Sequence, residues 1–217
     1  DEGSIHLDGQ KEVIQDPTAS LNLGISAIHQ ESVMFDELSV MENIFIGNHI
    51  TKSNRLVDWT SMEKKTIELL GNLEADIKPD EKIKDLSIAQ RHIVQISRSL
   101  VHDADIVIMD EPTASLSQKE IDELYVIIRN LKKQNKSIIF ISHKLDEVLE
   151  ICDEFTVLRD GELIKTDLIS NTNKDQLVTY MAGREISQIF PKKHVKIEDE
   201  IFSVKNLYKK TQFKNIN

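Results

Sequence analysis

Apolar residues recur along the chain with two different periods, and the change between them marks the predicted elements. From residue 36 to about residue 98 they recur every three or four positions, which predicts helices. The alternating residues 3–10 predict a short strand or hairpin arm, and short apolar runs predict strands at residues 24–30, 105–110 and 137–142. The last two runs are continuous, which is typical of strands buried in a parallel sheet. The order strand, helix, strand, helix over residues 105–151 therefore predicts a right-handed α/β unit.

Three pairs of polar residues have the spacing of a helix capping box, in which Ser or Thr is followed three positions later by Glu or Gln. They are Thr60 with Glu63, Ser87 with Gln90, and Ser117 with Glu120. Each pair precedes an apolar repeat, so we expect a helix to begin at each. Further on, Asp160 and Gly161 predict the turn of a β-hairpin. Residues 144–151 and 173–183 predict helices, the second of which ends at Gly183.

Composition and charge narrow the chemistry. The 217 residues carry a formal net charge of −10, which argues against a broad nucleic-acid surface. The single cysteine, Cys152, excludes a disulfide within the chain. None of the seven glycines is followed by Lys, and no two lie close together, so these residues contain neither a G-x-x-x-x-G-K-[ST] loop nor a G-x-G-x-x-G turn. Any nucleotide chemistry would therefore either proceed without a phosphate-binding loop or use one that lies outside these residues.

Polar side chains follow the two continuous strands. Asp110 and Glu111 close the first, and His143 follows the second. Because parallel strands end at the same edge of a sheet, we expect these groups to converge there. One carboxylate can hold Mg²⁺, directly or through water, and another can deprotonate an attacking water. The acidic pair alone also fits an ordinary helix entry, and the histidine at the same edge favours the chemical interpretation.

Five motifs, in order along the chain, resemble those of ATP-binding-cassette (ABC) ATPases. Residues 86–90 (LSIAQ) resemble the signature motif, and residues 106–113 (IVIMDEPT) resemble the Walker B motif with its following glutamate. Gln30 resembles the Q-loop glutamine, residues 114–117 (ASLS) resemble the D-loop, and His143 resembles the switch histidine. The resemblance covers the chain to about residue 191. It implies an α/β fold, with a partial P-loop NTPase (RecA-like) core around a parallel sheet, a helical signature subdomain and the remnant of an antiparallel β subdomain.

The resemblance also implies roles for individual residues. In ABC ATPases two cassettes pack head to tail with two ATP molecules between them, so ATP and Mg²⁺ are the implied cofactors. Asp110 and Gln30 would serve Mg²⁺, Glu111 would be the general base, and His143 would bind the γ-phosphate. The implied nucleotide-binding positions are Gln30, Ser87, Ile88, Ala89, Gln90 and Ser115. A helix N-terminus offers free N–H groups and a positive dipole end to phosphate, although Ala89 stands where a glycine is common.

Finer features resemble the first cassette of monosaccharide (ribose, galactose or xylose-type) importers, which fuse two cassettes in one chain. These features are Asp58 with Trp59, Ile88 with Ala89 inside the signature, Ser117, and residues 181–184 (MAGR). The implied domains are an ABC ATPase domain over 1–190, with its helical subdomain at about 37–98, a linker over 191–200, and the beginning of a second ABC domain over 201–217. Residues 201–207 alternate like the opening strand of that second domain.

The family's phosphate loop, with its strand and helix, would precede Asp1, so the chain resembles a cassette fragment without its phosphate cradle. We therefore expect the isolated chain to be inactive, to bind ATP feebly, and to be marginally stable because apolar surface is left uncovered.

The expected function is that of an ATP-binding and ATP-hydrolysing subunit that energises sugar import from the cytoplasmic face of the cell membrane, where it is peripheral. Its expected partners are a second ABC cassette, membrane permease subunits and, indirectly, a periplasmic or extracellular sugar-binding protein, with no nucleic acid. Two alternatives stay open: a non-hydrolysing module that supplies a signature motif in trans, and a soluble ABC-type translation ATPase. A DNA-repair type fits less well, because the stretch from Gln30 to Ser87 is short and has no sustained heptads.

Overall fold

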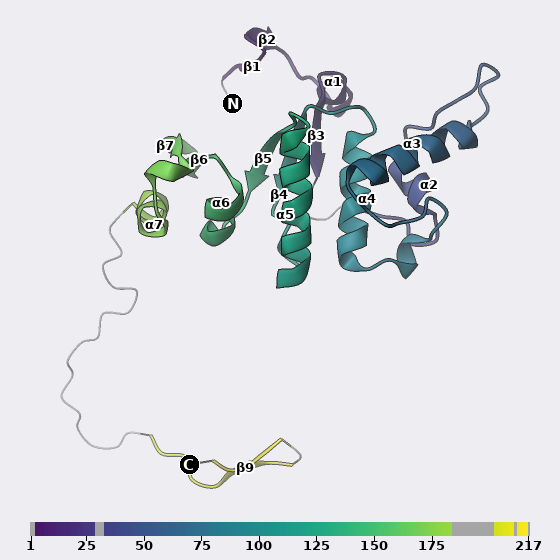
Figure 1. The fold of residues 1–217 in the computed structure, drawn as a ribbon. Coiled ribbons are helices and arrows are strands. Elements are labelled where there is room, and N and C mark those ends of the chain that lie inside the picture. Colours follow the sequence, from purple (N-terminus) through teal and green to yellow (C-terminus); the bar gives the residue numbers. More distant parts are fainter. Residues whose placement is uncertain (1–2, 29–32, 184–201, 211, 217) are drawn as a thin grey trace.

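A three-stranded parallel sheet forms the centre of the structure. The computed structural model describes residues 3–28, 33–183, 202–210 and 212–216. The sheet has the order β3–β4–β5, formed by Ile25–Ile28, Ile106–Asp110 and Ser137–Ile141 (Figure 1). Helix α5 (Gln118–Lys133) connects β4 to β5, and α6 (Leu145–Ile151) follows β5. The predicted strand–helix–strand–helix unit is therefore confirmed.

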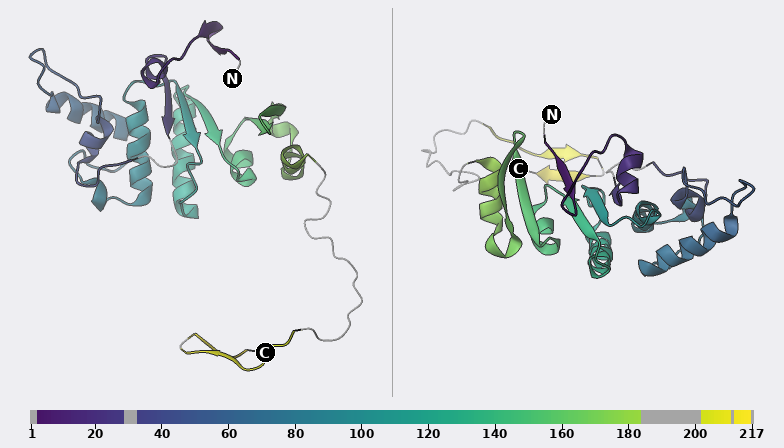
Figure 2. Two further views of the ribbon diagram at one scale, coloured as in Figure 1. Left: turned by 180° about the vertical axis from the view of Figure 1, so that it is seen from behind. Right: turned by 90° about the horizontal axis from the view of Figure 1, so that it is seen from above.

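Two further groups of elements lie beyond the two edges of this sheet, one next to β3 and the other past β5 (Figures 1 and 2). A helical lobe beside β3 contains α2 (Val40–Ile44), α3 (Trp59–Asn72), the 3-10 turn η1 (Ile83–Asp85) and α4 (Ile88–Leu100). Beyond α6 lie the antiparallel hairpin of β6 (Glu154–Arg159) and β7 (Glu162–Leu168), the 3-10 turn η2 (Ile169–Asn171) and α7 (Lys174–Ala182). The hairpin at Asp160 and Gly161, and a helix that ends at Gly183, are as predicted.

The ends of the chain form two small hairpins. β1 (Ile5–Leu7) pairs with β2 (Gln10–Glu12) in antiparallel fashion, and α1 (Pro17–Asn22) follows before β3. β8 (Leu207–Lys209) pairs with β9 (Phe213–Ile216) in the C-terminal part. None of the described helices is long and apolar enough to cross a membrane.

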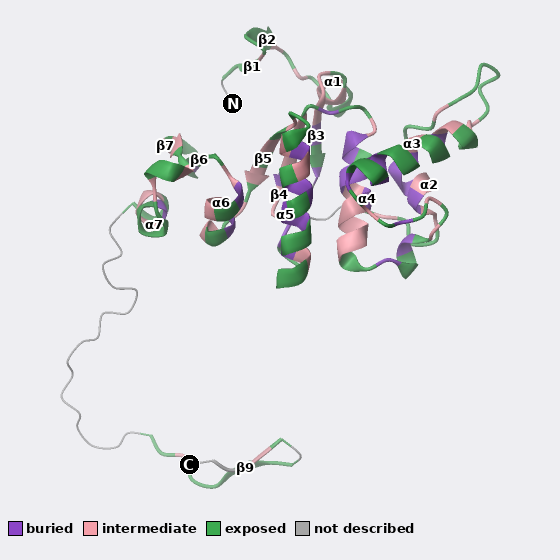
Figure 3. Cartoon of the chain, viewed as in Figure 1, coloured by how far each residue is buried: buried purple, intermediate pink, exposed green. Residues whose placement is uncertain are grey.

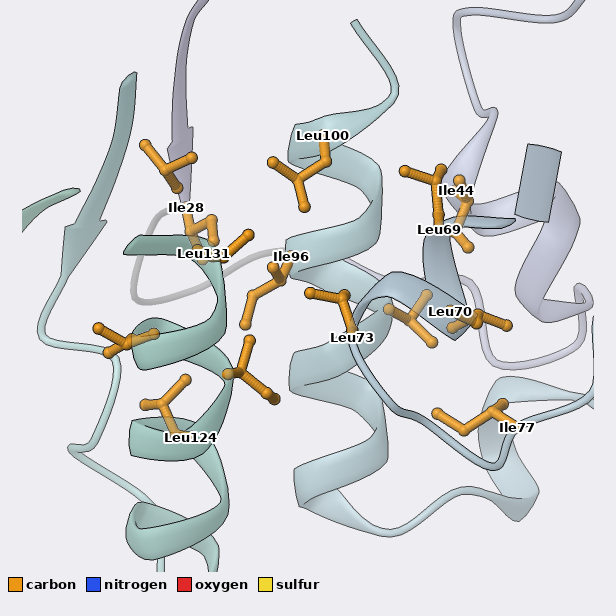
Figure 4. Close-up of a cluster of buried hydrophobic side chains, with 14 of the residues drawn as sticks. Ile28, Ile44, Leu69, Leu70, Leu73, Ile77, Ile96, Leu100, Leu124 and Leu131 are labelled. Atoms are coloured by element: carbon orange, nitrogen blue, oxygen red, sulfur yellow. The ribbon is translucent and has the colours of Figure 1, made fainter. Parts of the chain in front are cut away.

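One hydrophobic core joins the sheet to the helical lobe. Figure 4 shows Ile28 of β3, Leu124 and Leu131 of α5, and Ile96 of α4 converging in this cluster. Figure 3 shows that α5 is buried along one face and exposed along the others, as its apolar period predicts. Helix α4 is buried mainly in its C-terminal half, at Val94, Ile96, Ser97, Ser99 and Leu100. The core therefore fixes the start of α4 relative to the ends of the sheet strands.

The opposite face of the sheet is open. Successive side chains of a strand point to opposite faces, and the register aligns Ala27, Ile108 and Ile139 on the face away from the core. On this face Ile139 is 50% exposed and Ile141 is 47% exposed. The outer edge of β5 also pairs with no strand among the described residues. The continuous apolar run at 137–142 predicted burial on both faces, and that is wrong for β5.

Two other predicted element boundaries differ from the structure. Helix α3 begins at Trp59 and not at Thr60. The N-cap is Asp58, whose side chain accepts the N–H of Ser61 at 3.2 Å. The strand predicted over 201–207 is also wrong, because residues 202–206 form no strand and β8 begins only at Leu207. Residue 201 and the linker predicted over 191–200 lie outside the described residues.

Candidate functional site

Asp110 and Glu111 lie where β4 leaves the sheet. Asp110 is the last residue of β4 and is aligned with Ile141 of β5. The Glu111 N–H donates to the Ile141 carbonyl at 2.9 Å, so the backbone ladder extends one residue beyond the strand. Glu111 has a φ of 46°, in the left-handed region that costs a non-glycine residue about 1–2 kcal/mol. Such strained backbone clusters at functional sites, where the surrounding structure holds it in place.

Glu111 and His143 meet across the ends of β4 and β5. The Nδ1 atom of His143 lies 2.8 Å from Oε1 of Glu111. The His143 side chain is 65% exposed and that of Glu111 is 31% exposed. An exposed contact of this kind contributes little to stability. The convergence that the sequence predicted at this edge is therefore present.

The predicted magnesium site is only partly described. Asp110 is half-exposed at the sheet edge, and an accessible carboxylate oxygen there is the kind of ligand that Mg²⁺ takes, together with water and phosphate oxygens. Gln30, the other predicted ligand, lies outside the described residues. Within the described part of the chain, no group of three or more His, Cys, Asp or Glu side chains could hold a metal ion. Asp110 could supply one oxygen ligand, and Mg²⁺ bound there would need its other ligands from elsewhere.

The signature residues form the N-terminal turn of α4, and their capping box is confirmed. The Ser87 hydroxyl accepts the Gln90 N–H at 3.2 Å, and Oε1 of Gln90 accepts the Ser87 N–H at 2.9 Å. Ile88 and Ala89 form the first turn between them, and Ile88 is exposed. Both polar side chains are therefore engaged in capping, which leaves the backbone and dipole of the helix N-terminus as the groups suited to an anion.

The turn after β4 carries the predicted D-loop. The Ala114 N–H donates to the Glu111 carbonyl at 3.2 Å, and the Leu116 N–H donates to the Thr113 carbonyl at 3.3 Å. Ser115, the predicted nucleotide-binding residue, is exposed within this turn. At its end, the hydroxyl and N–H of Ser117 donate to Glu120 at 2.7 and 2.8 Å. Those two bonds lower the pKa of Glu120, and the N–H of Ala89 and nearby His92 add to the effect. The D-loop end of α5 therefore adjoins the signature end of α4.

The predicted residues fall into two groups, one at the ends of β4 and β5 and one at the start of α4. Asp110, Glu111, His143 and Ser115 share the edge where the sheet strands end. The signature residues lie at the start of α4, which Figure 1 shows on the side toward which β3 points. Within the described part of the chain, no hydrogen bond or ion pair joins the signature residues to Glu111 or His143.

Sequence reasoning missed a buried group beneath the pair. The Glu147 carboxylate accepts the Thr113 hydroxyl at 2.7 Å and the Ser142 hydroxyl at 3.1 Å, and Lys144 lies 3.1 Å away. The one sequence feature that could have revealed Glu147 is its spacing from Ile151. Glu147 lies one helical turn before this buried residue and therefore on the buried face of α6. A carboxylate at an apolar helical position calls for a partner.

A groove of about 320 Å³ lies between the start of α4 and the segment before α2. Its lining residues are Met34, Asp36, Ile88, Arg91, His92 and Gln95. Arg91 and Asp36 form an ion pair at 3.2 Å across it. Burial lowers the pKa of His92, partly offset by Glu120, so this imidazole is favoured in its neutral form. Val33 and Phe35 beside the groove are exposed, which leaves an apolar rim.

The chain is similar to proteins of known family. The family model described as ABC transporter matches residues 1–114. Ribose import ATP-binding protein RbsA 3 of Rhizobium etli is 46% identical over 216 residues, which is 100% of this chain and 42% of that protein. A putative ribose/galactose/methyl galactoside import ATP-binding protein of Burkholderia lata is 41% identical over 95% of this chain and 39% of its own length. The chain thus spans less than half the length of these curated relatives.

Solved structures agree on the fold. An ATP-binding cassette of an ABC transporter, in its ADP conformation, matches with a TM-score of 0.71 and 24% identity, over 85% of this chain and 78% of that one. A nucleotide-free ATP-binding cassette matches with a TM-score of 0.68 and 25% identity, over 83% and 77% of the two chains. The α/β fold with a parallel sheet is thereby confirmed. With the family match over more than half of its residues, the chain belongs to the ABC transporter family.

Proposed function

We propose that this chain is part of an ATPase that hydrolyses ATP to drive sugar import through a membrane permease. The observation that carries the proposal is the contact between Glu111 and His143 at 2.8 Å, beside Asp110 at the end of the parallel sheet. The names of the relatives, which are ribose or galactoside import ATP-binding proteins, support the sugar-import part. An intact pair of this kind favours hydrolysis over a module that only supplies a signature motif.

Each group at the sheet edge has a chemical role in the proposal. Glu111 accepts a proton from the attacking water and orients it toward the γ-phosphate. Nδ1 of His143 contacts Glu111, so Nε2 is the ring atom that would hydrogen-bond the γ-phosphate. Asp110 would hold Mg²⁺, with Gln30 as a further ligand, and the metal would neutralise charge on the phosphates. The protein forms no covalent bond to the substrate in this scheme, so the positions of these groups determine the rate.

The proposal assigns the signature to a neighbouring active site. Ser87, Ile88, Ala89 and Gln90 would contact ATP held by a second cassette, and Ser115 of the D-loop would lie at the same interface. Among the residues that the structure describes, no hydrogen bond or ion pair joins the signature residues to Glu111 or His143, which supports this assignment. The open face of the sheet around Ile139 supports completion of the cassette by a further strand and helix that carry the phosphate loop.

In domain terms we propose an ABC ATPase domain over 1–190, a linker over 191–200, and the start of a second ABC domain over 201–217. The fused protein would be peripheral at the cytoplasmic face of the membrane, and a sugar-binding protein would deliver sugar to the permease.

The groove beside Phe35 and Ile88 is the surface we assign to the permease, because its apolar rim follows Gln30 in the chain and adjoins the signature. A nucleotide signal at either motif could then reach the membrane partner.

The test is ATP hydrolysis by the full-length protein reconstituted with its permease and sugar-binding protein in liposomes. Glu111→Gln keeps the shape of the side chain and removes the base, so we expect the hydrolysis rate to fall about 100-fold or more. Glu123→Gln is the matched control, because Glu123 is an exposed residue of α5 whose contact is Lys119 at 3.8 Å. Hydrolysis at the wild-type rate in Glu111→Gln would refute the proposal. Hydrolysis stimulated by ribosomes and not by the permease would favour the translation ATPase instead.

A further inference from the structure

A buried hydrogen-bond network lies under the Glu111–His143 pair and is centred on Glu147 of α6. The Thr113 hydroxyl lies 2.8 and 2.7 Å from the two carboxylate oxygens of Glu147, and the Ser142 hydroxyl lies 3.1 Å from one of them. The Lys144 ammonium lies 3.1 Å from the carboxylate and donates to the Thr113 carbonyl at 3.1 Å. The Ser142 hydroxyl in turn accepts the Lys144 N–H at 3.0 Å. Both carboxylate oxygens of Glu147 are therefore bonded.

Because this network is buried, removing one of its side chains leaves the remaining polar groups with fewer partners and with little water to replace them. Glu147 is 7% exposed and Thr113 is 2% exposed. A carboxylate taken out of water is costly unless hydrogen bonds and an opposite charge compensate it. The described partners of Glu147 are two hydroxyls and one ammonium group, and they come from two separate turns. The carboxylate thus holds the two turns at a defined separation.

Those two turns carry the reacting groups. Thr113 lies two residues after Glu111, and Ser142 immediately precedes His143. Besides the Glu147 network, the described contacts between the turns are the bond from the Glu111 N–H to the Ile141 carbonyl and the Glu111–His143 contact itself. Glu111 also has the strained φ of 46°, which needs surrounding contacts to hold it. The side-chain network and this backbone bond together fix where Glu111 and His143 meet.

We propose that Glu147 is a positioning residue for hydrolysis, which sets the distance between Glu111 and His143 through Thr113 and Ser142. The inference rests on the proposed function for its catalytic consequence, and on the contacts alone for the mechanical link. Without the carboxylate, the contacts left between the Thr113 and Ser142 turns, among the described residues, are the backbone bond, the Lys144 contacts and the Glu111–His143 contact itself. Displacements near 1 Å in a reacting group can cost about 100-fold in rate, so a modest loosening has a large effect.

The mechanical link is tested by amide hydrogen exchange in the full-length protein. For Glu147→Gln we expect exchange to rise at least fivefold at residues 110–114 and 141–144, and to stay unchanged in α4. Glu150→Gln is the matched control, since Glu150 lies one turn further along α6 and pairs with Arg129 at 2.6 Å, away from both turns. Faster exchange throughout the fold would make Glu147 a general stability residue and overturn the proposal. Unchanged exchange at the two turns would overturn it as well.

The catalytic consequence is tested in the reconstituted full-length protein. We expect Glu147→Gln and Thr113→Val each to lower kcat by about 10- to 100-fold with KM for ATP changed less than threefold. Thr113→Ser keeps the hydroxyl and should restore most of the rate, whereas a role in packing alone predicts no such rescue. A kcat within twofold of wild type for Glu147→Gln would overturn the positioning role. If the wild-type protein shows no Glu111-dependent hydrolysis, the proposed function fails, while the exchange measurement still decides the link.

Discussion

Gly183 and Gly71 show how differently one residue type can act in this chain. Gly183 follows α7 with a φ of 71°, and its N–H donates to the Thr179 carbonyl at 2.8 Å, which closes the helix. A Cβ there would also crowd the Arg159 guanidinium. Gly71 lies inside α3, outside the left-handed region, with no other group within 4 Å of a Cβ. The sequence identified Gly183 as a helix stop, because glycine is the residue that the left-handed position favours.

Alanine at these two positions should change stability in opposite directions. Gly183→Ala forces a side chain into the left-handed region and should lower the free energy of unfolding by about 1–2 kcal/mol. Gly71→Ala should raise it by about 0.5–1 kcal/mol, because alanine loses less backbone entropy in a helix. Urea unfolding of the two variants beside the wild type measures both. Equal effects of the two substitutions would contradict this account of the end of α7.

At the level of elements, local patterns predicted most of the structure, and long-range contacts account for the failures. The box at Ser87 was predictable because its partners lie three residues apart. The start of α3 was not, since Asp58 and Thr60 are both good caps. The Asp58 N–H donates to the Ile50 carbonyl at 2.8 Å, which fixes the chain entry at Asp58. Glu147 escaped prediction for the same reason, because its partner Thr113 is distant in sequence.

Removing the Asp58 side chain tests which residue caps α3. The Ser61 N–H, then the Ser61 hydroxyl, lower the pKa of Asp58 below its usual value of 3.8. A carboxyl whose pKa falls on folding stabilises the fold above that value, and the effect is lost as the pH falls through the lowered pKa. Asp58→Ala should therefore lower the melting temperature by about 2–4 °C at pH 7, and by less near pH 3. Thr60→Ala is the control, and a larger loss there would restore Thr60 as the cap.

For the whole molecule, the one-sided sheet is the feature that sequence reasoning described least well. The apolar run of β5 predicted burial without saying what would cover each face. Ile138 and Phe140 pack against the core, whereas Ile139 and Ile141 of the same strand are exposed. An apolar face next to an unpaired strand edge favours association with another surface. The marginal stability that we expect of the isolated chain would arise here.

Substitutions on the two faces of β5 test whether the exposed face is covered in the longer protein. In the 217-residue chain, Ile138→Thr should lower the free energy of unfolding by about 1–3 kcal/mol, because it puts a hydroxyl against the core. Ile139→Thr should leave stability nearly unchanged and reduce concentration-dependent association in sedimentation experiments, since its side chain faces water. In the full-length protein, where we propose that a strand and helix cover this face, Ile139→Thr should become as costly as Ile138→Thr. If it remains neutral there, the face stays open, and the proposed completion of the cassette around β5 is wrong.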